Sequence, residues 1–258
     1  MGFLSEAVEE VRRRLEREPL DESGLMALAM RLPPTRGFVG AMWSAAPVAL
    51  VAEVKRASPS AGRIAEAEPA AQARAYEAAG AAAVSVLTEP RHFDGSLADL
   101  RAVHLATSLP VLRKDFLVHP AQLMEARVGG ADAVLLIVAA LSDPELAAML
   151  AAADDLGLGA LVEAHSERDL ERALATPAKV IGVNARDLET LEVEVDRGQA
   201  LLERVPADRI AVAESGISER EHVERAVAAG ARAVLVGEAL MRADDPGAKL
   251  RELLGEDR

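Results

Sequence analysis

Short apolar runs alternate with longer amphipathic stretches along most of the chain. Consecutive runs end roughly 20 to 35 residues apart, which fits one strand plus one crossover helix per unit and so a parallel sheet. The runs are continuous in apolar character, as in residues 133–138, which indicates strands that are covered on both faces. The eight predicted strand ends are Val54, Leu87, Arg113, Ile137, Val162, Val183, Ala213 and Val236.

A repeated segment marks the passage from helix to strand. The form Gly-Ala-x-Ala-Val begins at Gly80, Gly130 and Gly230. Each copy follows a helical pattern and opens an apolar run, so its glycine is expected to end a helix just before a buried strand. Eight such units predict an α/β fold of the (β/α)₈ TIM barrel type. An open doubly wound sheet would give similar runs.

The segment ahead of the first strand lacks this pattern. It holds a charged helical stretch, 6–18, followed by Pro33-Pro34. The charges favour a solvated helical extension over a cap on the barrel mouth. We therefore expect an N-terminal helical extension at residues 1–46 and a (β/α)₈ barrel catalytic domain at residues 47–258.

Composition and charge limit the partners. The 258 residues are half apolar, which is the usual size of one barrel with an extended core. A formal net charge of −13 argues against nucleic-acid binding, which needs a basic surface. The absence of cysteine excludes thiolate chemistry. Acidic residues near the start and the lack of a long uncharged apolar run argue against a signal peptide or membrane span. We expect a cytoplasmic monomer that binds an anionic small molecule.

Polar residues gather at the predicted strand ends, where (β/α)₈ barrels hold their chemistry. Glu53 and Lys55 are two apart on the first strand, so both side chains are expected to point into the barrel. An internal ion pair that only fixes packing is the alternative. The other polar or glycine residues at these ends include Lys114, Glu163, Asn184, Arg186, Glu214, Ser215, Gly216, Gly237 and Glu238.

Lysine is rare in this chain. Of 29 basic residues only four are lysine: Lys55, Lys114, Lys179 and Lys249. Two of these fall at strand ends, where arginine could supply charge but hardly donate a proton. A lysine in such a pocket can have its pKa lowered by burial and serve as an acid, a base or a Schiff-base nucleophile.

Glycines after the last two strands predict a phosphate site. Gly216 and Gly237 would offer backbone N–H groups, with Ser58 and Lys55 available across the barrel. The histidines show no paired ligand spacing, so we expect surface positions for them and no catalytic metal. They are His92, His104, His119, His165 and His222.

Seven sequence blocks stand at the strand ends, in order, between residues 47 and 242. They are 52–60, 85–89 with 93–96, 112–116, 161–163, 182–188, 213–216 and 237–241. Together they resemble the indole-3-glycerol phosphate synthase family. The block Glu53-Val-Lys-Arg-Ala-Ser-Pro-Ser60 is highly specific by itself.

The resemblance implies a cofactor-free lyase of tryptophan synthesis. Its substrate, 1-(2-carboxyphenylamino)-1-deoxyribulose 5-phosphate, carries both phosphate and carboxylate. Ring closure with loss of carbon dioxide, then loss of water, gives indole-3-glycerol phosphate. Ring closure needs a cation near the developing alkoxide and a base for the departing proton.

The resemblance also implies roles for particular residues. Lys114 would be the general acid at the ribulose carbonyl, and Glu163 the carboxylate that handles protons on the other side. Lys55 would contact the substrate carboxylate and phosphate, and which lysine serves the dehydration stays open. Glu53 and Asn184 would orient Lys55, the anilinic nitrogen and the sugar hydroxyls. The implied binding residues are Glu214 and Ser215 at the ribulose chain; Ser58, Gly216, Gly237 and the backbone N–H of Glu238 at the phosphate; and Phe93, Phe116, Leu135 and Arg186 at the anthranilate.

The chain departs from the family pattern in three places. Ala185 replaces a common asparagine, residues 1–46 match only loosely, and Glu238 is compatible with phosphate only if its carboxylate turns away. The alternatives are a phosphate-binding barrel isomerase, such as phosphoribosylanthranilate isomerase, a Schiff-base aldolase using Lys114, or a non-catalytic phosphate-binding barrel. The isomerase resemblance lacks the Glu53–Lys55 pair.

Overall fold

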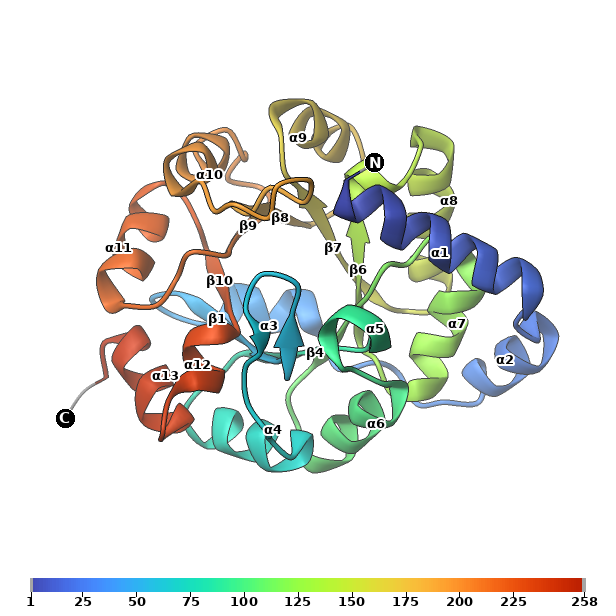
Figure 1. Cartoon of the computed structure of the whole chain (residues 1–258), viewed down its shortest axis with the longest axis horizontal. Helices are drawn as coiled ribbons and strands as arrows, with labels where there is room; N and C mark the ends of the chain where they lie inside the picture. The colour runs from blue at the N-terminus through green and yellow to red at the C-terminus, as the bar shows by residue number, and fades with distance from the viewer. Residues whose placement is uncertain (1, 257–258) are drawn as a thin grey trace.

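Eight parallel strands close into one barrel with helices around it (Figure 1). The computed structural model describes residues 2–256. Each barrel strand pairs with the next along the chain, and the last pairs with the first. In chain order they are β1 (Ala49–Val54), β4 (Ala83–Leu87), β5 (Val111–Lys114), β6 (Ala133–Ile137), β7 (Gly159–Ala164), β8 (Val180–Asn184), β9 (Ile210–Glu214) and β10 (Ala233–Val236).

The pairing of β1 with β10 closes the sheet, which confirms the predicted barrel and excludes the open doubly wound sheet. Every observed strand ends within two residues of its predicted end. The connections hold the helices α4 (Pro69–Ala78), α5 (Pro90–Phe93), α6 (Leu97–Ala106), α7 (Pro120–Gly129), α8 (Asp143–Asp155), α9 (Glu167–Leu174), α10 (Val195–Leu202), α11 (Arg220–Ala228) and α12 (Glu238–Arg242), with α13 (Pro246–Leu254) last and a 3₁₀ turn, η1 (Val138–Ala140), after β6.

The three repeated glycines lie at the junctions from helix to strand. Gly80, Gly130 and Gly230 have φ of 94°, 99° and 100°. This left-handed backbone ends a helix and suits glycine, which has no Cβ to clash with the preceding turn. A barrel strand begins three residues after each glycine, so the predicted junctions are confirmed.

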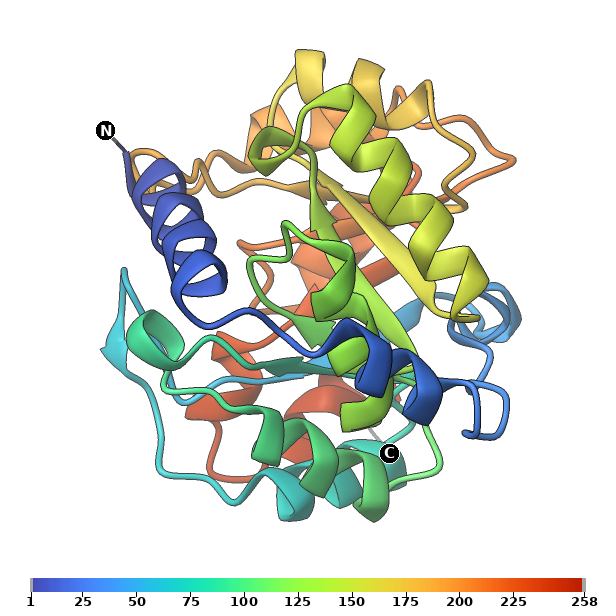
Figure 2. The same cartoon turned by 90° about the vertical axis from the view of Figure 1, so that its right-hand side faces the viewer.

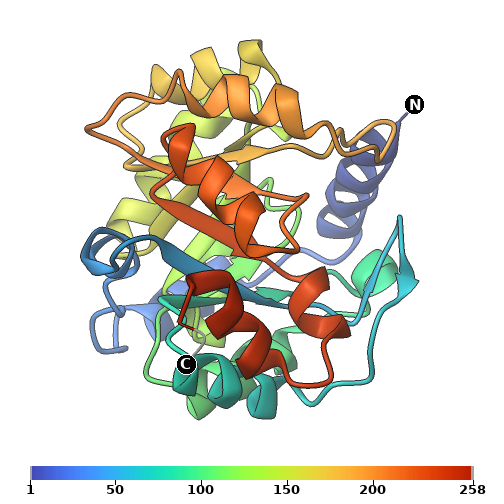
Figure 3. The same cartoon turned by 90° about the vertical axis from the view of Figure 1, so that its left-hand side faces the viewer.

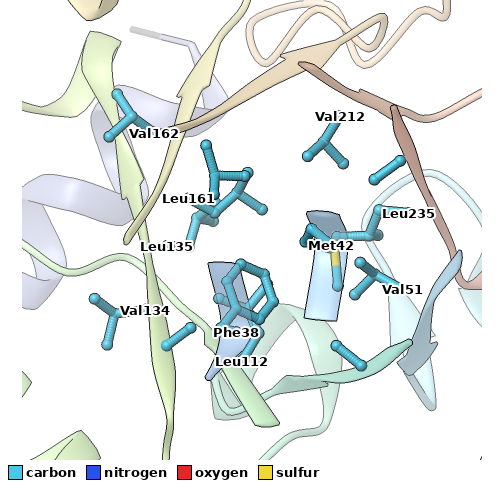
Figure 4. Packing of buried hydrophobic residues seen from close by; sticks show 14 of the residues in the cluster. Phe38, Met42, Val51, Leu112, Val134, Leu135, Leu161, Val162, Val212 and Leu235 are labelled. Carbon is cyan, nitrogen blue, oxygen red and sulfur yellow. The ribbon is translucent and has the colours of Figure 1, made fainter. Parts of the chain in front are cut away.

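A short helix closes the amino-terminal end of the barrel. Phe38 and Met42 of α3 (Phe38–Ser44) are buried among strand side chains such as Leu112 and Leu161 (Figure 4). Gly159, the first residue of β7, allows this approach, because a Cβ there would meet the Phe38 side chain at 3.2 Å. Burying each of these two side chains contributes about 1.5–3 kcal/mol.

The first helix crosses the opposite, carboxyl end of the barrel. Figure 2 shows α1 (Phe3–Arg17) on the same side as the hairpin of β2 (Ala57–Ser58) and β3 (Gly62–Arg63). Its apolar face is buried through Leu4, Ala7 and Val11. Its charged face makes ion pairs with the barrel, from Arg12 to Glu145 and from Glu10 to Arg91.

The expectation of a solvated extension is therefore wrong for α1. Apolar residues spaced three and four apart form a face that needs a partner, and the carboxyl end of the barrel supplies it. The second helix, α2 (Glu22–Ala29), packs against α7 on the outside of the barrel.

The hairpin after β1 also stands over the barrel mouth (Figure 3). Arg56 fixes its base, because the guanidinium lies 2.6 Å from a carboxylate oxygen of Asp99 and donates to the backbone oxygen of Asp94. Within residues 2–256 we find no helix with the length and apolar character needed to span a bilayer.

Candidate active site

A cavity of about 830 Å³, counted with its opening to solvent, lies at the carboxyl end of the barrel. Most of the residues expected at a site line it: Glu53, Lys55, Ser58, Phe93, Lys114, Asn184, Arg186, Glu214, Ser215, Gly216, Gly237 and Glu238. Three expected residues lie outside the lining: Glu163, Phe116 and Leu135.

Glu53 and Lys55 project from β1 into the cavity, as their spacing predicts. Lys55 Nζ lies 3.1 Å from Glu53 Oε1, and the Glu53 side chain is almost fully buried. The carboxylate also needs the glycine at position 237, because a Cβ there would stand 2.4 Å from Glu53 Oε1. The pair thus places one partly exposed lysine side chain on the cavity wall.

Lys114 lies between two further carboxylates. Its Nζ is 3.5 Å from Glu163 Oε2, at the end of β7, and 3.7 Å from Glu214 Oε2, at the end of β9. The Glu163 and Glu214 side chains are only 1% and 2% exposed. Gly182 makes room for this arrangement, since a Cβ at that position would stand 2.3 Å from Glu214 Oε1.

The charges around Lys114 decide its protonation state. Burial alone would lower the Lys114 pKa, but the negative charges of Glu163, Glu214 and Glu53 outweigh it, so the pKa is raised above its ordinary value. Lys114 is therefore an ammonium group at neutral pH and carries a proton that it can donate, in contrast to the lowered pKa that burial alone would give. An ammonium is a poor nucleophile, which argues against a Schiff-base aldolase.

The two carboxylates beside Lys114 titrate in opposite directions. Burial tends to raise the pKa of Glu163, but Lys114 and His165 overcome this and leave that pKa below its ordinary value. Burial and the nearby Glu163 charge raise the pKa of Glu214 well above its ordinary value. Two carboxylates that share one site cannot both ionise easily, so Glu163 ionises first and Glu214 keeps its proton to a higher pH.

Asn184 and the loop after β9 form the next part of the wall. Asn184 Oδ1 accepts hydrogen bonds from the Arg186 backbone N–H at 3.0 Å and from Ser215 Oγ at 2.7 Å. These bonds fix the amide and leave its nitrogen as the donor for a ligand. Ser215 and Gly216 both have positive φ, 66° and 76°, so the chain turns sharply at the cavity wall that both residues line.

The end of the cavity that is expected to bind phosphate is formed by the β2–β3 hairpin and the start of α12. Ser58 of β2 and Gly237 line the cavity together with Glu238, the first residue of α12. The Glu238 carboxylate lies 2.9 Å from Arg242 Nε, one turn along the helix. That ion pair occupies the carboxylate, so the backbone N–H of Glu238 can meet an anion.

Aromatic side chains form the opposite side of the cavity. Phe93 lines it, and Phe116 packs behind Phe93 with ring centroids 6.4 Å apart. The expectation that Leu135 lines the cavity is wrong, since Leu135 belongs to the barrel core beneath (Figure 4). Phe3 of α1 lines the cavity instead, with its ring centroid 6.0 Å from that of Phe116.

Replacing Phe3 with alanine is expected to raise KM about fivefold and to leave kcat nearly unchanged. Part of an aromatic wall is lost, while Lys114 and its carboxylates are untouched. Steady-state kinetics checks this, with the exposed Leu105 replaced by alanine as the control. An unchanged KM would mean that α1 does not contribute to ligand binding.

His165 corrects the expectation that the histidines lie at the surface. Its side chain is 9% exposed, and its Nε2 lies 3.0 Å from Glu163 Oε1. The spacing rule that pairs Glu53 with Lys55 also pairs Glu163 with His165, two residues on, and could have identified it. Among residues 2–256, no group of three or more His, Asp or Glu side chains is arranged to hold a metal ion.

The fold and the site define a (β/α)₈ barrel enzyme with acid and base groups at the carboxyl ends of its strands. The sequence profile described as indole-3-glycerol phosphate synthase matches residues 3–253. The chain belongs to this family.

Named relatives agree with the profile. An indole-3-glycerol phosphate synthase of Micrococcus luteus is 50% identical and covers 97% of this chain and 96% of its own length. One of a Nocardioides species is 55% identical over 82% of each chain, and one of Leifsonia xyli is 50% identical over 96% of this chain and 95% of its own.

Solved structures at lower identity share the fold alone. A 3-hexulose-6-phosphate synthase aligns with TM-score 0.64 at 19% identity, over 82% of this chain and 100% of its own. A thiamine phosphate pyrophosphorylase from Pyrococcus furiosus aligns with TM-score 0.59 at 16% identity, over 81% and 94%.

Proposed function

We infer that the chain catalyses decarboxylating ring closure and dehydration of 1-(2-carboxyphenylamino)-1-deoxyribulose 5-phosphate to indole-3-glycerol phosphate. It is a carboxy-lyase of tryptophan synthesis. The observation that carries this function is the Lys114 ammonium group, 3.5 and 3.7 Å from two buried carboxylates, on a cavity that also holds the Lys55–Glu53 pair.

Ring closure joins the ring carbon that bears the carboxylate to the ribulose carbonyl carbon. As the new carbon–carbon bond forms, the carbonyl oxygen takes a proton from Lys114. The substrate carboxylate then leaves as carbon dioxide, and its bonding electrons restore the aromatic ring. A positioned general acid of this kind is worth about 10²- to 10⁴-fold in rate.

Dehydration removes the new hydroxyl group as water and a proton from the neighbouring carbon. The hydroxyl leaves after protonation by a lysine, for which Lys55 and Lys114 both line the cavity. Glu163 is the ionised carboxylate and serves as the base. Because Glu163 lies behind Lys114 and outside the cavity lining, a proton reaches it along Lys114 or after the Lys114 side chain moves aside.

The remaining cavity residues bind the substrate. The phosphate lies against Ser58, Gly216, Gly237 and the backbone N–H of Glu238, and the ribulose chain against Glu214 and Ser215. Asn184 and Glu53 orient the anilinic nitrogen, the sugar hydroxyls and Lys55. The anthranilate ring lies against Phe93 and Phe3, beside Arg186, with Phe116 as support from behind.

The direct test is to incubate the purified protein with the carboxyphenylamino substrate and follow indole fluorescence. Growth of the indole signal with release of carbon dioxide is expected. If the substrate is bound but unchanged, the protein is a binding barrel; if borohydride traps a covalent adduct, Lys114 or Lys55 forms a Schiff base instead.

Inorganic phosphate is expected to inhibit competitively, because it fills the anion site that the substrate phosphate occupies. The pattern is read from initial rates at several substrate concentrations. Sodium chloride at equal ionic strength controls for screening. Purely noncompetitive inhibition would place phosphate somewhere other than the substrate site.

We also propose that the protein works as a cytoplasmic monomer. The barrel completes its own cavity from one chain, since β1, β5, β8, β9, β10 and α1 all contribute lining residues. Sedimentation equilibrium at micromolar concentration should give the mass of one chain, and a doubled mass would overturn the monomer.

A further inference from the structure

The two carboxylates beside Lys114 are nearly equivalent in position. Their Oε2 atoms stand 3.5 and 3.7 Å from Lys114 Nζ, and both side chains are at most 2% exposed. Lys114 donates one long hydrogen bond to Glu163 and none to Glu214, but so small a difference in distance does not explain why one carboxylate ionises before the other. Something else must distinguish Glu163 from Glu214.

His165 supplies the difference. Its Nε2 lies 3.0 Å from Glu163 Oε1; this is a close polar contact rather than a hydrogen bond, since Nε2 forms no hydrogen bond among residues 2–256. Within the same residues, neither carboxyl oxygen of Glu214 has a hydrogen-bond partner. An ionised carboxylate only accepts hydrogen bonds, so this close contact is attractive when the imidazole carries its proton on Nε2.

We propose that His165 is a positioning residue which, through Nε2 and Glu163 Oε1, keeps Glu163 rather than Glu214 as the ionised carboxylate beside Lys114. The same contact turns Glu163 Oε2 toward Lys114. This role rests on the proposed function, in which Glu163 is the base and Lys114 the acid. His165 itself lies outside the cavity lining and does not touch the substrate.

The strand charges that face the pair come from β5 and β1. Lys114 projects from β5 and acts on both carboxylates, and Glu53 projects from β1 and acts on Glu214. The lowered pKa of Glu163 and the raised pKa of Glu214 agree with a single proton in the pair that is held by Glu214. Without a donor at position 165, that proton can pass to Glu163, and the base is then neutralised in part of the molecules.

Two variants separate the polar contact from packing. His165→Leu keeps the bulk and removes the donor, while His165→Gln keeps an N–H donor that can reach the same oxygen. For His165→Leu we expect kcat to fall about tenfold or more, and the acidic limb of the kcat profile to move up by about one pH unit. The limb moves up because Glu163 is active when ionised, and loss of its donor raises its pKa.

For His165→Gln we expect kcat within about threefold of the wild type and an unmoved acidic limb. KM should change little in either variant, because His165 does not line the cavity. Equal losses in both variants, or a wild-type acidic limb in His165→Leu, would overturn the proposal in favour of a packing role. Circular dichroism confirms that both variants are folded.

Infrared spectra of the protonated carboxyl band test the proposal without turnover. At neutral pH the band of the wild type should disappear on Glu214→Gln and be unaffected by Glu163→Gln. In the His165→Leu background, Glu163→Gln should remove part of the band. If it removes none, His165 does not select the ionised carboxylate. Because this readout needs no substrate, its failure is distinct from failure of the proposed activity.

Discussion

Replacing Lys114 with arginine is expected to reduce kcat by about 10²- to 10⁴-fold, with KM for the substrate changed far less. A guanidinium keeps the positive charge between Glu163 and Glu214, so the buried carboxylates stay compensated and the barrel folds. It cannot replace the acid, because arginine is not deprotonated in proteins and its planar, delocalised guanidinium cannot take the position of one compact ammonium group. Steady-state kinetics with the carboxyphenylamino substrate measures the loss.

The matched control is Lys249→Arg. Lys249 lies on α13, where its Nζ is 2.6 Å from Glu252 Oε1 and remote from the cavity lining. This change should leave kcat and KM as in the wild type. Affinity for inorganic phosphate should be retained in Lys114→Arg as well. Turnover near the wild-type rate in Lys114→Arg would mean that Lys114 is not the acid.

Much of the fold could be predicted from the sequence because its determinants are local. A barrel strand covered on both faces must be apolar along its whole length, and a helix that ends on a left-handed residue favours glycine. The runs around 133–138 and the glycines at 80, 130 and 230 carry this information directly. Closure of the barrel was less certain, since an open sheet needs the same runs.

The position of the first helix on the barrel could not be predicted from the residues of the helix alone. The spacing of Leu4, Ala7 and Val11 predicts that one face of the helix is buried. Nothing in residues 3–17 indicates which surface of the protein that face packs against. The charges on the other face made a solvated helix the simpler expectation. Phe3 was therefore not predicted as a site residue, although it lines the cavity.

Within the barrel, residue spacing predicted which way a side chain points better than how far along the barrel axis it lies. Glu53, Lys55 and Lys114 point into the cavity, as residues at the ends of their strands should. Leu135 also faces inward, but it lies one layer below the cavity in the packed core. Sequence periodicity gives the face of a strand; the height along the barrel axis depends on the stagger of neighbouring strands, which only the assembled barrel defines.

Replacing both Glu163 and Glu214 with glutamine is expected to lower the pKa of Lys114, whereas Glu163→Gln alone should lower it far less. In the single variant, Glu214 loses the repulsion of Glu163, ionises in its place and continues to hold the ammonium proton. In the double variant only Glu53 remains of the three carboxylates that raise the Lys114 pKa, and burial then lowers it. The acidic form of Lys114 is present below its pKa and lost above it, so the double variant should lose the acid as pH rises through a range where the wild type keeps it.

Nuclear magnetic resonance of labelled lysine side chains can follow this titration, because the chain has only four lysines and Lys114→Arg identifies the signal. A Lys114 pKa that stays at its wild-type value in the double variant would show that the neighbouring carboxylates do not control the acid.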